Sequence, residues 1–410
     1  MIGNKARRSV HVCLSLLMAV GLFLAGCSSA TNQSDSSGPV KIGVIGAFQL
    51  AAGKEIQDAA KLAIEEINAA GGILGRPVEA IYADTKANPE EGRAVVERLL
   101  YQDQVDFIIG EHRSEVALAV QPVIMENKKI FINTGSASPI VTENVANDYE
   151  FNKYTFRPML SSAQLGEGFM KQFDQMVQEE GYSKVALIAE AAVWVDPIVV
   201  EFEQKYKDKL VLLERPATDT EDYSIELSKL KESGAEIAMT LFSANQGIVF
   251  SRQWAERQIP VVITGYNVQA QSPDFWKQTE EKAQGILTWK HGVRSEITEK
   301  SVPFWDNFTK AYNRVPGPYT GITSYDGVWV IADAANQAGT LDSDKLVETL
   351  ENGTFTGASG IIKFSEDHGY MIGDDFVPFT YIQWQDGEMV AVWPDTIATG
   401  KPVKPEWIQQ

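Results

Sequence analysis

The sequence predicts an α/β fold in two lobes, each built on a mainly parallel sheet covered by helices. Short β-branched apolar runs alternate with longer amphipathic segments along most of the chain. This alternation is typical of parallel sheets with helices on both faces. It breaks around Phe156-Arg157-Pro158 and then restarts. Because the strands are too many for one ordinary sheet, we expect two lobes.

The first half of the chain contains the clearest pairs of strand and helix. Segment 40–46 is short, β-branched and closed by glycine, as expected of a buried strand. In segment 54–70 the apolar residues have the spacing of one helix face, and Gly71-Gly72 marks its end. We predict further strands at 78–82, 105–110 and 129–133, and helices at 89–100 and 115–126.

The second half repeats the pattern and then changes it. We predict helices at 164–180, 197–206, 224–233 and 246–256, and strands at 184–190, 210–214, 236–242 and 261–265. The tail contains apolar runs at 361–364, 379–384 and 389–393, joined by turns such as Gln385-Asp386-Gly387. Short runs joined by tight turns indicate antiparallel strands added at a sheet edge.

The N-terminal segment has the layout of an export signal. A basic opening with Arg7 and Arg8 precedes an apolar run at 10–25, which is short for a membrane span of ~20 residues. The run ends in Leu24-Ala25-Gly26-Cys27, which resembles the bacterial lipobox. We expect 1–26 to be removed, Cys27 to be acylated and anchored to the cell membrane on its extracytoplasmic side, and 27–39 to carry the tether. A buried apolar helix ending by chance at cysteine, or a twin-arginine signal, fits less well.

The composition excludes several classes of function. The chain has 36 basic and 55 acidic residues, a formal net charge of −19, which argues against a nucleic-acid partner. Its 2 cysteines are Cys13 and Cys27, so the exported domain has no disulfide to form. No histidine and cysteine spacing suits a metal, and no nucleophile elbow is present. We expect no metal, no cofactor and no enzyme activity.

Loops at the carboxyl ends of the predicted strands form the expected binding site. In the first lobe these are 46–49, 111–114 and 134–138, which are rich in small or polar groups. In the second lobe, 190–194 and 265–267 have the corresponding positions. Two such rims that face each other form a cleft able to close on a small solute.

The chain resembles the leucine/isoleucine/valine-binding family of bacterial transport proteins over 39–394. The matching stretches include VKIGVIGAF, INTGSASPIVT, YDGVWVIADAANQAG and, most specifically, the block INAAGGILGRPV at 67–78. The resemblance implies the type I periplasmic-binding fold, with two Rossmann-like lobes joined by three hinge crossings. We place the crossings near 156–157, 288–289 and 356–359. The expected first lobe is then 40–156 plus 290–357, and the second is 157–289 plus 358–400.

The same resemblance implies a function. Such a protein, as a monomer, captures a small solute by hinge closure and delivers it to the membrane subunits of an ABC permease. The chain has no Walker A sequence and so is not the motor. A lipoprotein sensor of the same fold, which signals to a membrane receptor, is the alternative.

The ligand residues carry over unevenly from the family. Ser114 has the position of a hydroxyl residue that holds the carboxylate of an amino acid, and Ser136 replaces the usual threonine. Trp194 stands where an aromatic residue is expected. Arg113 suits a carboxylate, and aromatic side chains could wall an apolar solute. The candidate ligand-binding residues are Phe48, Gln49, Arg113, Ser114, Gly135, Ser136, Ala137, Trp194, Phe242, Tyr266 and Asn267.

Asn267 is the largest departure, because amino-acid binders usually have an acid there for the ligand ammonium. Glu190 or Asp196 could replace it. Otherwise the solute is not a standard α-amino acid, and a branched-chain amino acid or a related amide or carboxylate stays the default.

Several polar residues also have a purely structural explanation. Ser114 could simply be the N-cap of the helix at 115–126. We expect His112 and His291 to be structural and His368 to be solvated in a turn.

Overall fold

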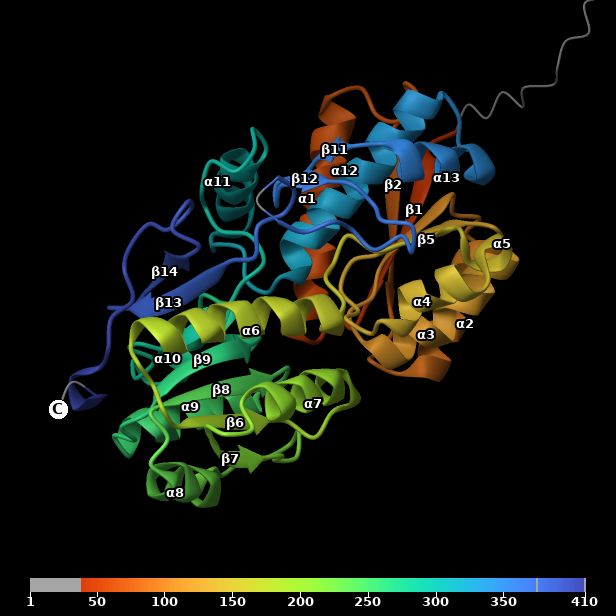
Figure 1. Ribbon diagram of the computed structural model, residues 1–410. Helices are drawn as coiled ribbons and strands as arrows, with labels where there is room; N and C mark the ends of the chain where they lie inside the picture. Colours follow the sequence, from red (N-terminus) through yellow and green to blue (C-terminus); the bar gives the residue numbers. More distant parts are fainter. Residues whose placement is uncertain (1–37, 374, 409–410) are drawn as a thin grey trace, which may run out of the picture. The chain divides into compact units, whose positions relative to one another are not determined.

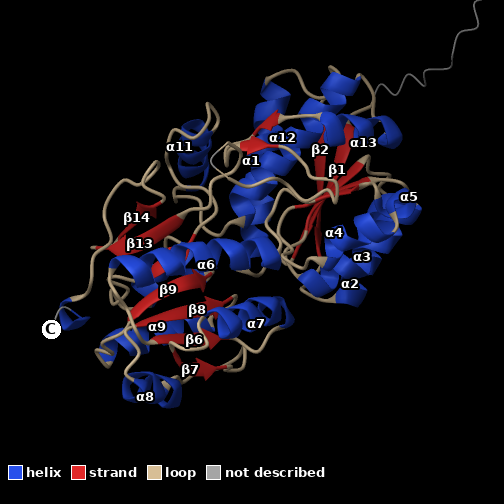
Figure 2. Ribbon diagram, viewed as in Figure 1, coloured by secondary structure: helices blue, strands red, loops and turns tan. Residues whose placement is uncertain are grey.

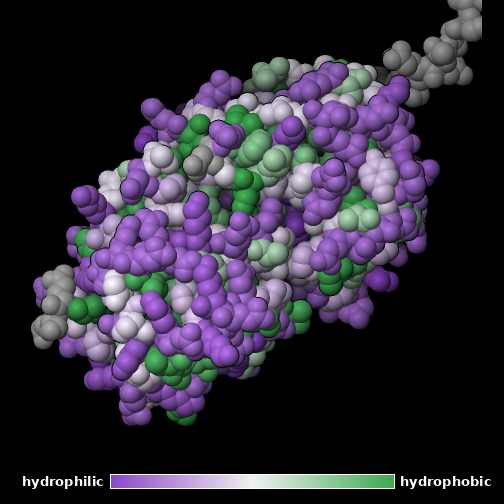
Figure 3. Space-filling view, viewed as in Figure 1, coloured by the Kyte–Doolittle hydropathy of each residue, from purple (hydrophilic) through white to green (hydrophobic). Residues whose placement is uncertain are grey.

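The computed structural model describes residues 38–373 and 375–408. The predicted leader, Cys13, Cys27 and the tether up to residue 37 lie outside the described residues. Within the described part of the chain, no helix combines the length and apolar character needed to cross a membrane. The face of the molecule in Figure 3 is mostly hydrophilic, with scattered hydrophobic residues, in agreement with the acidic composition.

A parallel sheet of order β2-β1-β3-β4-β5 forms the centre of the first lobe (Figure 1). The β-branched run of β1 is almost fully buried, because helices α1, α12 and α13 lie on one face of the sheet and α2 to α5 on the other (Figure 2). The strands are β1 (Val40–Gly46), β2 (Val78–Asp84), β3 (Phe107–Gly110), β4 (Ile130–Asn133) and β5 (Thr155–Phe156). The helices are α1 (Ala51–Ala69), α2 (Pro89–Tyr101), α3 (Ser114–Glu126), α4 (Ile140–Asn147), α5 (Tyr149–Asn152), α11 (Ser301–Tyr312), α12 (Thr320–Ala338) and α13 (Ser343–Asn352).

A second parallel sheet, of order β7-β6-β8-β9, forms the centre of the second lobe. Its strands are β6 (Val185–Ala189), β7 (Leu210–Glu214), β8 (Ile237–Phe242) and β9 (Val262–Asn267). Its helices are α6 (Ser162–Glu179), α7 (Asp196–Lys205), α8 (Ser224–Ser233), α9 (Gln246–Glu256) and α10 (Phe275–Gln278). Helix α6 begins with a capping box in which Ser161 and Gln164 satisfy each other's main-chain amides.

Two of the three predicted C-terminal strands, those at 379–384 and 389–393, confirm the antiparallel addition. They form a sheet of order β10-β13-β14, from β10 (Leu287–Trp289), β13 (Tyr381–Gln385) and β14 (Glu388–Trp393). The turn before β14 places Asp386 and Gly387 at positive φ, which suits a tight hairpin. A small antiparallel pair, β11 (Phe355–Thr356) and β12 (Ile361–Ile362), comes before the last crossing and so belongs to the first lobe.

The chain passes between the two lobes three times, as the fold class requires. It leaves the first sheet between β5 and α6, returns between β10 and α11, and leaves again between β12 and β13. This path brings the carboxyl ends of strands from both parallel sheets toward one region. The predicted two-lobed α/β fold is therefore confirmed.

The predicted bounds of helices and strands agree best with the observed ones where the local sequence pattern is strong. The predicted β1, β7, α8 and α9 coincide with the structure. The predicted break at 156–158 is present, but the strand β5 that ends at Phe156 was not predicted, because it is too short to leave a pattern. One loop prediction was wrong. Residues 265–267 are not a loop, because Tyr266 and Asn267 pair in register with Leu241 and Phe242 of β8.

Candidate ligand-binding cleft

A cavity of about 1110 Å³ lies where loops of both lobes meet. Loops after β3 and β4 form one wall, and loops after β6 and β8 form the other. Ser162 at the start of α6 and Tyr319 just before α12 also belong to the lining. Apolar and aromatic side chains predominate, among them Leu118, Val193 and Val200. The cavity is therefore at the edge of the sheets where the sequence placed the site.

Five of the candidate residues line this cavity and six do not. The five that line it are Arg113, Ser114, Ala137, Trp194 and Tyr266. The other six, Phe48, Gln49, Gly135, Ser136, Phe242 and Asn267, are absent from its lining. Two lining residues were not predicted from the sequence, Ser162 at the start of α6 and Tyr319 just before α12, because neither follows a predicted strand. His112 was predicted to be structural, although it lies in the cavity wall.

Ser114 is the first residue of α3, so its reading as the N-cap is wrong. The N-cap is Arg113, which makes no side-chain capping bond. The Ser114 hydroxyl oxygen accepts hydrogen bonds from Ser136 Oγ at 3.1 Å and from the main-chain amide of Ser138 at 3.3 Å. Since Ser114 Oγ accepts both bonds, its own proton is left to point elsewhere. Ser136 itself is fully buried behind it and supports the loop.

The charged groups in the lining are already paired. Arg113 donates from Nε and Nη2 to Glu115 Oε1, at 2.9 and 2.6 Å. Asp196 accepts a hydrogen bond from Arg215 at 2.8 Å. These pairs are partly exposed, so each contributes little to stability. A solute entering the cleft meets little uncompensated charge from them.

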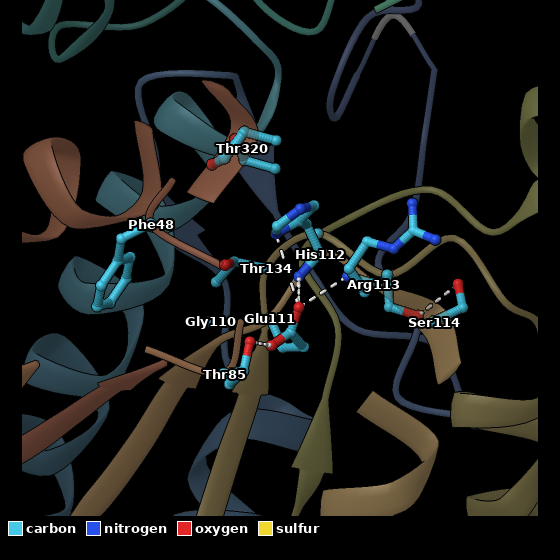
Figure 4. A network of polar contacts seen from close by, with 12 residues as sticks. Phe48, Thr85, Gly110, Glu111, His112, Arg113, Ser114, Thr134 and Thr320 are labelled. Atoms are coloured by element: carbon cyan, nitrogen blue, oxygen red, sulfur yellow. Dashed lines mark hydrogen bonds and ion pairs between the residues drawn. The ribbon is translucent and has the colours of Figure 1, made fainter. Parts of the chain in front are cut away.

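A buried carboxylate supports the loop after β3 (Figure 4). Glu111 accepts hydrogen bonds from the Thr85 hydroxyl at 2.7 Å and from the amides of His112 and Arg113, at 2.9 and 2.8 Å. Burial raises the pKa of Glu111, although these hydrogen bonds act to lower it. The backbone of Glu111 has positive φ, and the network offsets that strain.

His112 is neutral in this environment. Burial, together with the charge of Arg113, lowers the pKa of its imidazole to about 3. Its Nδ1 lies 3.6 Å from Oε1 of Glu111. Within the described residues, no three metal-ligating side chains come together. His112 therefore acts here as a neutral polar group of the wall.

A model of the periplasmic binding protein family matches residues 39–388. The chain belongs to the periplasmic binding protein family. Leu/Ile/Val-binding protein homolog 7 of Brucella melitensis is 23% identical over 398 residues, covering 93% of this chain and 97% of that protein. Members of this family are solute-binding proteins, not enzymes.

Two solved structures show the same fold with different ligands. The branched-chain amino acid transporter substrate binding protein from Streptococcus pneumoniae, in complex with isoleucine, is similar with a TM-score of 0.75 and 22% identity. That alignment covers 86% of this chain and 97% of the other. An ABC transporter solute binding protein from R. palustris, in complex with benzoate, has a TM-score of 0.72 and 18% identity, with 90% and 99% covered.

In this periplasmic binding protein, Asn267 does not face the cavity, contrary to the expectation. Its side chain is buried and its Nδ2 donates to Gly247 O at 3.0 Å and Ser251 Oγ at 3.3 Å. Its Oδ1 accepts from the amides of Gln269 and Ala270. Because Asn267 is the last residue of β9, it anchors the turn that follows.

Phe242 and Phe48 also lie away from the cavity. Phe242 is fully buried in the second lobe, with its ring centroid 5.1 Å from that of Phe250 and 5.8 Å from that of Tyr223. Phe48 packs edge-on against Tyr82, and Figure 4 shows it on the opposite side of the Glu111 network from Ser114. Gln49 next to it is exposed.

Gly135 lies behind the cavity wall rather than in it. Its carbonyl oxygen accepts a hydrogen bond from the Tyr319 hydroxyl at 2.8 Å. A Cβ at this position would lie 2.8 Å from the Cβ of His112, so only glycine fits without a shift. Gly135 thus keeps Tyr319 and His112 close together at the base of the cleft.

Glu190 is buried beneath Trp194 and does not line the cavity. It accepts hydrogen bonds from Trp194 Nε1 at 2.6 Å and from the Ser243 amide at 2.9 Å. The Ser243 hydroxyl and the Gln246 side-chain amide donate to it as well. Both carboxylate oxygens are therefore occupied by protein donors.

The prediction that His368 is solvated was wrong. Its ring is 1% exposed and stacks on Phe156 with centroids 4.1 Å apart. Its two ring nitrogens lie 2.9 Å from Thr155 O and from Glu351 Oε1. The turn packs against β5, which is distant in sequence, so local turn chemistry could not show this burial.

Proposed function

We propose that the chain is the extracytoplasmic solute-binding component of an ABC importer, which closes two lobes around a small solute. The observation that carries the proposal is the cavity between Ser114 on one lobe and Trp194 on the other. The proposal includes the predicted lobes, 40–156 plus 290–357 and 157–289 plus 358–400, with the last boundary moved from 357–358 to between β12 and β13, where the chain leaves the first lobe. It also includes a monomeric state, a lipid anchor at Cys27 and delivery to the membrane subunits of the permease.

We infer that the solute presents a carboxylate to the N-terminus of α3. The amides of Ser114 and Glu115 have no hydrogen-bond acceptor among the described residues, as usual for the first turn of a helix. The Ser114 hydroxyl proton is free to join them. A helix N-terminus favours an anion through its amides and its dipole. Together these groups make a complete site for one carboxylate.

Among the described residues, the acids in or near the cleft are already paired, so none offers a comparable partner for an ammonium group. Both oxygens of Glu190 are occupied, and Asp196 is paired with Arg215. Asn267 is buried in its own hydrogen bonds. An unpaired charge enclosed in a closed cleft is costly. The site therefore favours an acid without an amino group over a branched-chain amino acid.

Aromatic and aliphatic walls indicate what the body of the acid should be. The ring of Trp194 meets that of Tyr266 nearly at right angles, with centroids 5.4 Å apart. Tyr266 in turn contacts Trp289 at 5.5 Å. These rings provide an apolar surface with well-defined geometry. The benzoate complex of the R. palustris protein of the same fold supports an aromatic acid as the first candidate.

The test is a binding comparison between acids and their amino counterparts. The chain from residue 27 onward, with Cys27→Ser, is titrated with benzoate, isocaproate and leucine, and with phenylpropanoate and phenylalanine. We expect at least one amine-free acid to bind, and to raise the unfolding free energy by about 2.7 kcal/mol at 100 times its Kd. Tighter binding of leucine or phenylalanine than of the matched acid would overturn the ligand class. No stabilisation by any of them would overturn both the class and the site.

A further inference from the structure

The imidazole of His112 is a polar group in the cleft that the proposed carboxylate site does not use. His112 belongs to the cavity lining, and its side chain is mostly buried. Nδ1 is buried and has no hydrogen-bond partner among the described residues. A buried polar atom without a hydrogen-bond partner costs free energy. The groups beside Nδ1 therefore decide whether the neutral ring is more stable with its proton on Nδ1 or on Nε2.

The carboxyl group of Glu111 lies beside Nδ1 of this ring. Oε1 of Glu111 lies 3.6 Å from Nδ1. Oε1 accepts the amides of His112 and Arg113, so it presents electron density whether or not the other oxygen is protonated. A bare lone pair on Nδ1 would face that oxygen unfavourably. Next to this oxygen, the neutral ring is more stable with its one proton on Nδ1 than on Nε2.

This assignment leaves Nε2 as a hydrogen-bond acceptor. Because the Nδ1 edge is buried against Glu111 (Figure 4), the opposite edge is the part that the cavity can reach. No hydrogen bond to Nε2 comes from any described residue. The low pKa of the buried imidazole keeps the ring from gaining a second proton near neutral pH.

We propose that Nε2 of His112 accepts a hydrogen bond from a hydroxyl group of the solute, so that the preferred solute is a hydroxylated apolar or aromatic acid. The inference rests on the proposed function and narrows its ligand class. When the cleft closes on an acid without a donor, Nε2 loses water and gains no partner. Sites built to bond a substrate hydroxyl reject the analogue that lacks it much more strongly than apolar pockets reject a missing methylene.

The experiment compares benzoate with the three monohydroxybenzoates and the three monomethoxybenzoates by calorimetry on the Cys27→Ser chain. A methoxy group adds size and an acceptor but no donor. We expect at least one hydroxybenzoate to bind about 10-fold more tightly than benzoate, as a hydrogen bond of about 1.4 kcal/mol gives, while its methoxy counterpart gains nothing. Equal gains for hydroxy and methoxy acids would overturn the inference and leave the carboxylate site standing.

Two variants locate the effect. His112→Phe keeps a flat ring but removes the acceptor, and we expect the ratio of hydroxybenzoate to benzoate affinity to fall toward one. Leu118→Ala, also in the cavity lining, should weaken both acids together and keep the ratio. A ratio unchanged in His112→Phe would assign the hydroxyl to another residue and overturn the inference. Failure of every acid to bind the parent chain would overturn the proposed function, and this inference with it.

Discussion

The indole Nε1 of Trp194 donates a hydrogen bond to Oε1 of Glu190 over 2.6 Å. This bond ties the aromatic wall of the cleft to a buried acid at the carboxyl end of β6. Ser243, from the loop after β8, donates to the same carboxylate through its amide and its hydroxyl. Glu190 thus joins two loops of the second lobe and holds Trp194 toward the solute, and it is not available to bind an ammonium.

Glu190→Gln should loosen this wall. The variant replaces an acceptor by a donor where four protein donors converge, so at least one donor loses its partner. We expect a loss of unfolding free energy of about 2–4 kcal/mol, measured by urea unfolding. Affinity for the bound acid should fall as well, since Trp194 loses its fixed orientation. Asp196→Asn, which breaks a partly exposed pair with Arg215, is the matched control and should cost under about 1 kcal/mol.

Ser114→Ala should lower affinity more than stability. It removes the hydroxyl proton proposed to bind the solute carboxylate, and we expect affinity to fall about 10-fold, equal to about 1.4 kcal/mol. Ser136→Ala removes the donor behind Ser114 but no group in the cavity lining, so its effect on affinity should be smaller. Calorimetry on both variants checks the order. A larger loss in Ser136→Ala would place the carboxylate elsewhere.

Asn267→Asp should destabilise the fold and should not create an amino-acid site. The new carboxylate oxygen would face Gly247 O, which now accepts from Nδ2 at 3.0 Å. Two acceptors would then meet inside the protein, at a cost of about 1–3 kcal/mol. Leucine titration of the variant is the decisive measurement. Strong binding of leucine by Asn267→Asp would mean that this residue reaches the ligand after the lobes close.

Local patterns predicted the elements, and the rule on strand ends predicted the position of the site. The strand at 40–46 was predicted correctly, because a β-branched run buried on both faces is typical of a strand in a parallel sheet. Ser114 and Trp194 follow from their places after β3 and β6. The loops that contain them were predicted from neighbours in sequence and a general property of parallel sheets, whereas the choice of these two residues within the loops came from the family resemblance.

Long-range packing determined what the sequence could not show. Asn267 was expected in a loop, but pairing with β8 extends β9 through it and turns its side chain into buried hydrogen bonds. Tyr319 enters the cleft from the N-terminus of α12, where its hydroxyl donates to the carbonyl of Gly135, 184 positions away. His368 is buried by β5 at a separation of 213 positions. None of these contacts leaves a periodic or motif signal.

The protein should lose stability as the pH falls below about 6.5, and His291 should account for part of this loss. His291 is 2% exposed, with Nε2 3.0 Å from the Tyr370 hydroxyl. Burial and the neighbouring Lys290 lower the pKa of its imidazole to about 3. The unfolded chain takes up this proton near pH 6.5 and the folded chain does so near 3. Between these values the unfolded state holds more protons, so stability rises with pH and falls on acidification, by about 1.4 kcal/mol per pH unit for one such histidine.

His291→Gln should flatten that dependence. Urea unfolding of the parent and the variant at a series of pH values from about 7 down to about 4.5 gives the difference in unfolding free energy at each pH. Groups such as Glu111 and Asp326, whose pKa burial raises, act in the opposite sense but are common to both chains and cancel in that difference. We expect the variant to be less stable than the parent near pH 7, where it lacks a well-packed ring. The gap should shrink steadily through the acid range. A gap that is constant with pH would show that His291 is protonated equally in the folded and unfolded chains.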